Sequence, residues 1–255
     1  MFQIFVYLIA GFSAGVVTGL AGLSAAAIIS PLLITLLGFP AFEAIGISLA
    51  SDVLASGLSA RTYAKNKHIA IRSGMWLLVP ALFLTVLGCF VSSNVDNSIL
   101  SLVSVAFPVL LGFNFLRDKG EQPINSGHYQ DNFTRRVLSI ISGAIVGAIC
   151  GFSGAGGGMM MLFLLTSLLG YELKTAVGTS VFIMTFLALV GSISHFAMYG
   201  SVRWVPLIIC ALSALVGAWF AARYANRADS RTLHRVIGGC LMVLGVFLLV
   251  FKVIL

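Results

Sequence analysis

Residues 147–180 read GAICGFSGAGGGMMMLFLLTSLLGYELKTAVGTS, and residues 15–48 read GVVTGLAGLSAAAIISPLLITLLGFPAFEAIGIS. The two stretches align at a constant offset of 132 positions (147 − 15). The matched residues are glycines and other small or apolar residues. The matches, in order, are Gly15 with Gly147, Gly19 with Gly151, Gly22 with Gly154, Leu32 with Leu164, Leu33 with Leu165, Leu36 with Leu168, Leu37 with Leu169, Gly38 with Gly170, Ala44 with Ala176, Gly46 with Gly178 and Ser48 with Ser180. A glycine-rich apolar stretch that occurs twice in one chain is typical of membrane transporters built by duplication.

The composition of the chain indicates a bilayer environment. Of the 255 residues, 59% are hydrophobic and 9% are charged, and the mean hydropathy is +1.06. This leaves too few polar side chains to cover a soluble globule. Because a spanning helix takes roughly 20 residues, we predict an all-α, polytopic integral membrane protein with about ten spans and no soluble catalytic domain. One transmembrane domain is expected over residues 1–255, with spans near 4–21, 23–38, 43–61, 74–92, 97–116, 135–151, 154–170, 174–199, 203–222 and 233–252.

The positions of the Lys and Arg residues predict the orientation. When the loops are assigned alternately to two sides, 13 of the 15 basic residues fall on one side, and Arg203 and Lys252 fall on the other. The positive-inside rule makes the first side the cytoplasm. Both termini are then expected outside, in the periplasm of a bacterial inner membrane. This placement also accounts for the net charge of +7 without a nucleic-acid partner.

An odd number of spans in each half predicts inverted repeats, because the second half then starts on the opposite side of the membrane. The first repeat is expected over residues 4–116 and the second over 135–252. The polar segment 117–134 is expected to be the cytoplasmic linker between them.

The strongest part of the repeat lies in Gly19–Pro31 and Gly151–Met161, each of which joins one span to the next. Glycine lets the backbone turn inside the membrane and frees amides at a helix start, where the macrodipole is positive. Such a start is suited to binding a small anion. The candidate substrate-binding residues in these turns are Gly22, Ser24, Ser153, Gly154, Gly156, Gly157 and Gly158. The alternative is that these glycines only allow close helix packing.

These motifs resemble the sulfite exporter TauE/SafE family, also described as the toluene-sulfonate uptake permease family. The resemblance covers nearly the whole chain and rests on Gly151–Gly158, Leu168–Gly170 and Ala176–Ser180. It implies a secondary carrier for sulfur-containing anions such as sulfite and organosulfonates. The first copy departs from the pattern, because Leu23–Pro31 reads LSAAAIISP in place of the glycine run.

Polar residues within the spans add further candidates. Ser48, Thr179 and Ser180 can donate hydrogen bonds to an oxyanion, or bond back to their own helices. Asp52 is an ionisable residue at membrane depth, and protonation would remove the cost of burying its charge. We therefore take Asp52 as a candidate for proton coupling; the alternative is a neutral or capped carboxyl that bonds to a neighbouring helix. Its counterpart in the second copy is Met184.

Three other residues are expected near the membrane surface. Glu43 is expected to cap a helix or contact lipid headgroups. His195 and its counterpart Tyr63 are expected at the interface, where amphipathic side chains gather.

The sequence also narrows the class of function. Cys89, Cys150, Cys210 and Cys240 lack paired spacing, so neither a disulfide nor a metal site is predicted, and no cofactor motif appears. No hydrolase or metalloprotease motif supports an intramembrane enzyme. We expect a secondary carrier of a small anion, with a passive anion channel, or a carrier of another organic anion such as a carboxylate, as alternatives.

Overall fold

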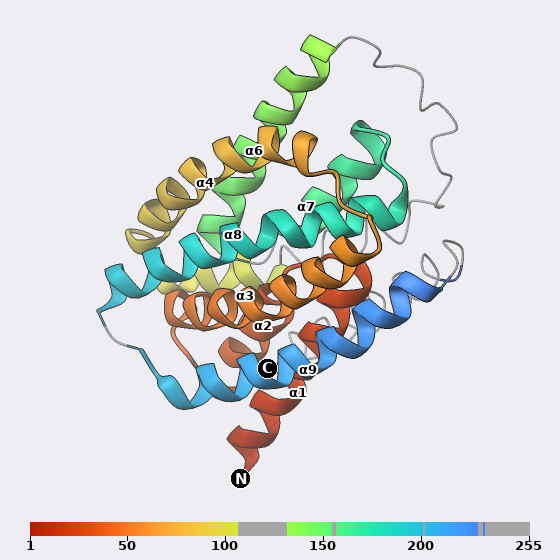
Figure 1. The fold of residues 1–255 in the computed structure, drawn as a ribbon. Helices are drawn as coiled ribbons and strands as arrows, with labels where there is room; N and C mark the ends of the chain where they lie inside the picture. Colours follow the sequence, from red (N-terminus) through yellow and green to blue (C-terminus); the bar gives the residue numbers. More distant parts are fainter. Residues whose placement is uncertain (107–131, 155–156, 201, 229–231, 233–255) are drawn as a thin grey trace.

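The computed structural model describes residues 1–106, 132–154, 157–200, 202–228 and 232, and every regular element in these ranges is a helix (Figure 1). The first half contains α1 (Phe2–Ala21), α2 (Ala26–Leu37), α3 (Ala41–Lys65) and α4 (Ile71–Ser93), followed by a helix over Asn97–Ala106. The second half contains α6 (Asn132–Ser153), α7 (Gly157–Phe163) with a π-helical turn over Leu164–Leu168, α8 (Leu173–Tyr199) and α9 (Trp204–Arg227).

Six of the described helices are long and apolar enough to cross a membrane, which confirms the prediction of an all-α polytopic membrane protein. They are α1, α3, α4, α6, α8 and α9. Large apolar side chains stand exposed on their outer faces, among them Phe83, Phe133 and Trp204. This is the surface that lipid would cover.

Two of the expected spans are shorter than a membrane crossing. The helix α2 has 12 residues, and the run of α7 and the π-helical turn covers residues 157–168 in the corresponding part of the second half. A helix of this length extends about 18 Å, against about 30 Å of hydrocarbon core. Each is therefore too short to cross the hydrocarbon core as a single helix. The expected span 233–252 lies outside the described residues, as does the linker 117–134 apart from its last three residues.

The helix boundaries repeat along the chain as the sequence does. The helices α1 and α6 end 132 residues apart, at Ala21 and Ser153, and α3 and α8 begin 132 residues apart, at Ala41 and Leu173. The turns repeat as well: Gly22 and Gly154 both have a φ of 68°. Their amides donate to the carbonyls of Thr18 and Cys150, at 2.9 and 2.8 Å. Only glycine adopts this left-handed backbone without strain, so the repeated glycines end the two helices.

Each half packs its first helix against the fourth helix of the other half. In Figure 1, α9 lies along α1, and α4 lies along α6 on the other side of the molecule. Glycines spaced four residues apart make both contacts close: Gly11, Gly15 and Gly19 meet Cys210, Ala214 and Ala218, and Gly143, Gly147 and Gly151 meet Leu77, Ala81 and Thr85. A Cβ at any of these glycines would overlap backbone atoms of the facing helix. Small residues at such spacing are the usual basis of helix association in membranes.

The counterpart helices α3 and α8 form the centre of the molecule and run antiparallel. Gly46 near the start of α3 lies against His195 and Phe196 near the end of α8, whereas Gly178 near the start of α8 lies against Tyr63 near the end of α3. In Figure 1 the pair crosses between the α4–α6 and α1–α9 pairs. The two short helices and their turns pack against this central pair.

Candidate functional site

The two glycine turns, one from each half, touch in the interior. The Ser24 hydroxyl of the first turn lies 3.3 Å from the Gly154 carbonyl oxygen of the second. Gly158 packs against the backbone of Leu23 and Ser24 so closely that a Cβ there would overlap the Ser24 nitrogen. The fold therefore brings together Gly22, Ser24, Gly154 and Gly158, which are far apart in the chain.

Asp52 of α3 completes the first turn. Ser24 Oγ donates to Asp52 Oδ2 at 2.8 Å and accepts from the Ala26 amide at 3.2 Å. Asp52 is completely buried, and its Oδ1 atom has no hydrogen-bond partner among the described residues. A buried carboxylate with a free oxygen is costly unless a proton or another donor reaches it. Asp52 is therefore placed to take up such a donor.

Ser180 of α8 ties the two turns together from the opposite side. Its hydroxyl donates to the Gly22 carbonyl oxygen at 2.8 Å, and the Gly158 carbonyl oxygen is a second acceptor at 3.4 Å. A hydroxyl carries a single proton. In this conformation the Ser180 hydroxyl therefore donates to the backbone of the turns. An anion would have to compete with the Gly22 carbonyl for that hydrogen bond.

Other predicted residues lie apart from this centre or make local contacts. Ser48 donates to the Ile45 carbonyl at 2.8 Å, and Ser153 to the Ile149 carbonyl at 3.0 Å. Both bonds stay within one helix. Gly156 lies outside the described residues, and Gly157 faces Cys150 and Met184.

Thr179 contacts a connection rather than the turns. Its Oγ1 atom accepts from the Ala70 amide, just before α4, at 3.0 Å. The neighbouring Gly178 is so close to the His68 carbonyl that a Cβ would overlap it. Together with Lys174, which donates to the Asn226 carbonyl at 3.2 Å, these contacts close one end of the α3–α8 pair. We call it the Lys174 end.

Two side chains that the sequence placed at the interface lie buried instead, which corrects that expectation. The Tyr63 hydroxyl donates to the Gly19 carbonyl at 3.0 Å, and His195 Nε2 lies 3.1 Å from the Gly151 carbonyl. A carbonyl only accepts, so Nε2 carries the ring proton. Both pairs obey the 132-residue offset, from Gly19 to Gly151 and from Tyr63 to His195. This offset was the signal that could have identified them.

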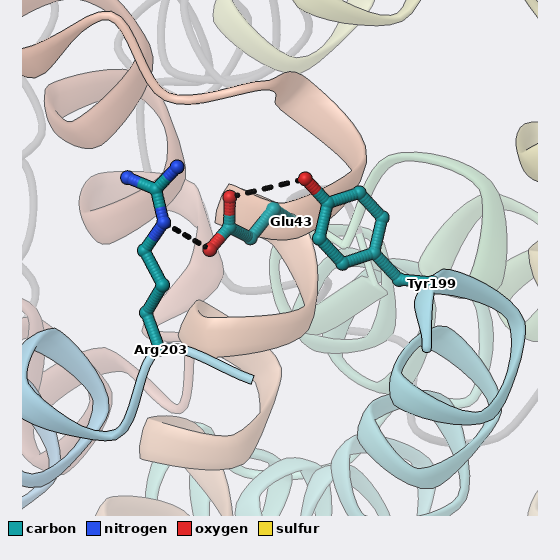
Figure 2. Close-up of polar contacts among 3 residues, drawn as sticks. All are labelled: Glu43, Tyr199 and Arg203. Carbon is teal, nitrogen blue, oxygen red and sulfur yellow. Dashed lines mark hydrogen bonds and ion pairs between the residues drawn. The ribbon is translucent and has the colours of Figure 1, made fainter. Parts of the chain in front are cut away.

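Glu43 is also buried rather than at a lipid surface. It is 2% exposed, at the start of α3. Arg203 Nε lies 3.0 Å from its Oε1 atom, and the Tyr199 hydroxyl donates to its Oε2 atom at 3.3 Å (Figure 2). The cluster joins the start of α3 to the end of α8 and the start of α9. These three residues form the second end of the central pair, which we call the Arg203 end.

The chemistry of the centre rests on hydroxyls, backbone amides and one carboxylate. Within the described ranges, no group of three His, Cys, Asp or Glu side chains could hold a metal ion. The turns provide polar groups in a surrounding of apolar helices. Such an arrangement offers hydrogen-bond partners to a small polar solute.

Comparison with known proteins agrees with this arrangement. The chain is 26% identical to the probable membrane transporter protein YunE of Bacillus subtilis (strain 168), over 94% of this chain and 95% of that protein. It is 22% identical to the probable membrane transporter protein ORF9 of Sinorhizobium sp, over 90% and 85% of the two chains. It is 23% identical to the probable membrane transporter protein YdhB of Bacillus subtilis (strain 168), over 89% and 92%. No solved structure matches the chain.

A family model gives the assignment. The model described as sulfite exporter TauE/SafE matches residues 7–248, which is nearly the whole sequence. It includes both glycine turns and both central helices. The chain therefore belongs to the sulfite exporter TauE/SafE family of membrane transporters.

Proposed function

We propose that this membrane transporter is a secondary carrier that moves a small anion, most consistently a sulfur oxyanion or an organosulfonate, together with a proton. The observation that carries the proposal is the meeting of the two glycine turns with Ser24, Asp52 and Ser180 in the buried centre. The TauE/SafE family supports the substrate class.

The chemistry of the turns supports an anionic solute. The Ala26 and Ala27 amides at the start of α2 donate to the Ser24 hydroxyl oxygen and carbonyl, and the helix macrodipole adds partial positive charge at this turn. The Ser24 and Ser180 hydroxyls become donors to an anion once they release their present acceptors, Asp52 and the Gly22 carbonyl. Donors without a full positive charge can release the anion again, as transport requires.

Asp52 gives a reason for coupling to protons. An ionised carboxylate next to the turns would repel an anion, whereas the protonated carboxyl would not. Proton and anion then favour each other's binding, which makes their movement interdependent. The free Oδ1 atom of Asp52 is where that proton would reside.

The burial of the centre favours a carrier over a channel. Asp52 and Ser180 are 0% exposed and Ser24 is 1% exposed. A solute would reach them only after one end of the molecule opens, which is the requirement of alternating access. A channel would need a path open at both ends together.

The same proposal includes ten spans in two inverted repeats, with both termini outside the cytoplasm. The antiparallel run of α3 and α8 supports inversion, because counterpart helices related by an axis in the membrane plane point in opposite directions. Labelling of single cysteines placed before α1 and after residue 252 tests the topology. Both should react with an impermeant reagent in intact spheroplasts, and reaction at only one terminus would refute an even number of spans.

Transport assays with the purified chain test the function. Uptake of sulfite, methanesulfonate and sulfate is measured in proteoliposomes with and without an imposed pH gradient, and counterflow is measured without a gradient. The proposal expects saturable uptake of at least one sulfur anion, faster with inward proton flow, and counterflow of the same anion. Uptake without saturation or counterflow would favour a channel. Transport of carboxylates alone would reject the sulfur substrate class.

A further inference from the structure

The Arg203 end is held by one ion pair between the halves. Glu43 belongs to α3 of the first half, and Arg203 and Tyr199 belong to the second. The Glu43 side chain is 1% exposed and that of Arg203 is 56% exposed. A buried carboxylate is thus neutralised by a guanidinium that still reaches the surface (Figure 2).

The guanidinium retains donors for a second anion. Glu43 is paired through Nε, and Figure 2 marks no contact between the two terminal nitrogens and the carboxylate. The Arg203 group also lies over the Phe39 ring, with its Cζ atom 4.6 Å from the ring centroid. It is therefore fixed in place at the surface. Planar guanidinium nitrogens bind oxyanions in pairs, so a sulfonate or sulfite fits them well.

The opposite end is closed by contacts of another kind. At the Lys174 end the Ala70 amide bonds Thr179, Lys174 bonds a backbone carbonyl, and His68 Nδ1 lies 2.9 Å from Asn226 Oδ1. Ala70 precedes α4 as Arg203 precedes α9. These Lys174-end contacts involve no carboxylate. Within the part of the chain that the structure describes, an ion pair closes the Arg203 end and none closes the Lys174 end.

We propose that Arg203 is the first anion-binding residue of the carrier, and that its pair with Glu43 is the lock that an arriving anion releases. The substrate first binds the two terminal nitrogens of the guanidinium, and its negative charge then competes with that of Glu43 until the Nε pair is released. The carboxylate, left without a cation in an apolar site, is then driven toward water, and α3 separates from the end of α8. This inference rests on the proposed anion transport and assigns its outer binding step.

A buried cysteine on α3 can report the opening. Ser48 lies five residues after Glu43, is fully buried and bonds only its own helix, so Ser48→Cys is a mild replacement. The four native cysteines are changed to alanine. The rate of reaction with a membrane-impermeant maleimide is measured in right-side-out and inside-out vesicles. Methanesulfonate serves as the anion, because sulfite itself reacts with maleimides.

Saturating methanesulfonate should raise the labelling rate several-fold, only in vesicles that expose the Arg203 end. Glu43→Gln should raise it about tenfold without anion and remove the anion's effect. Arg203→Gln should also abolish the response to the anion. The control Glu172→Gln, an exposed residue at the start of α8, should leave both rates unchanged. If Glu43→Gln does not yield monodisperse protein, Tyr199→Phe removes one bond to Glu43 and should raise labelling about twofold.

Two results would overturn the inference. One is a Glu43→Gln or Tyr199→Phe variant, well folded, that labels at the parental rate. The other is an anion response that persists in Arg203→Gln. Methanesulfonate counterflow in the same protein separates the two proposals: flux with unchanged labelling rejects only the lock, whereas loss of flux for every tested anion in the parent rejects the carrier.

Discussion

The turn after α1 and the turn after α6 begin with the same backbone conformation but differ in the side chains that follow. Gly22 and Gly154 have the same left-handed conformation, and each donates its amide to the carbonyl four residues before it. The first copy, however, has Ser24 and Asp52 where the second has Gly156 and Met184. The two departures from the repeat are in contact, since Ser24 donates to Asp52. Duplication thus accounts for the shape of the centre, and a single local pair of changes gives it an ionisable group.

The shared backbone depends on the absence of side chains, and this gives the largest expected effect. Gly158→Ala should cost about 3 kcal/mol, because its Cβ would overlap the backbone of Leu23 and Ser24. Gly170→Ala should cost only about 1–2 kcal/mol, because Gly170 has a positive φ but nothing within 4 Å. Apparent melting temperatures in detergent compare the two. Equal losses would mean that backbone conformation, and not the contact of the turns, limits stability.

Removal of the first-copy hydroxyl should come next in size. Ser24→Ala takes away the Asp52 donor and should destabilise the protein by about 1.5 kcal/mol. It should also weaken proton-driven uptake. Ser30→Ala is the matched control, since the buried Ser30 hydroxyl bonds only the Ala26 carbonyl of its own helix. Similar melting temperatures for the two variants would contradict a special role for the Ser24–Asp52 pair.

The counterparts Ser48 and Ser180 allow a direct comparison of the halves. Ser180→Ala breaks a bond to the other half and should cost about 1 kcal/mol. Ser48→Ala breaks a hydrogen bond within α3 and should cost about 0.3 kcal/mol. Thermal unfolding followed by size-exclusion chromatography measures both. The reverse order would show that Ser180 does not hold the turns together.

Removal of the Tyr63 hydroxyl is expected to cost less than removal of the Ser180 hydroxyl. Tyr63→Phe keeps the ring and removes one buried bond to Gly19, which should cost about 0.6 kcal/mol. His195→Phe removes the matching bond to Gly151 and should cost a similar amount. The same unfolding assay measures both variants. A large loss of stability in one variant alone would show that the two bonds contribute unequally to stability.

Much of this architecture could be predicted from the sequence because membrane helices follow simple rules. Hydropathy predicted the long helices, and the 132-residue offset predicted the paired turns at Gly22 and Gly154. Hydropathy did not predict that the helix 26–37 is short. An apolar run can extend across a turn, and glycine marks the turn without fixing its depth.

Side-chain partners were harder to predict. Asp52 was identified by its charge, but its bond to Ser24 depends on how α3 packs against the first turn. His195 and Glu43 were assigned to the surface because they lie near helix ends in the sequence. Their burial arises from the antiparallel contact of α3 and α8, in which the end of one helix is covered by the start of the other. Contacts between the two halves cannot be predicted from the hydropathy of neighbouring residues in the sequence.

The most direct test of the central claim compares Asp52→Asn with the parent in proteoliposomes. Asparagine keeps the size of the side chain and cannot ionise. The account predicts that the variant loses acceleration of sulfur-anion uptake by a pH gradient while it retains anion counterflow, because exchange needs no net proton movement. A variant that keeps gradient-driven uptake at the parental rate would contradict the coupling role of Asp52.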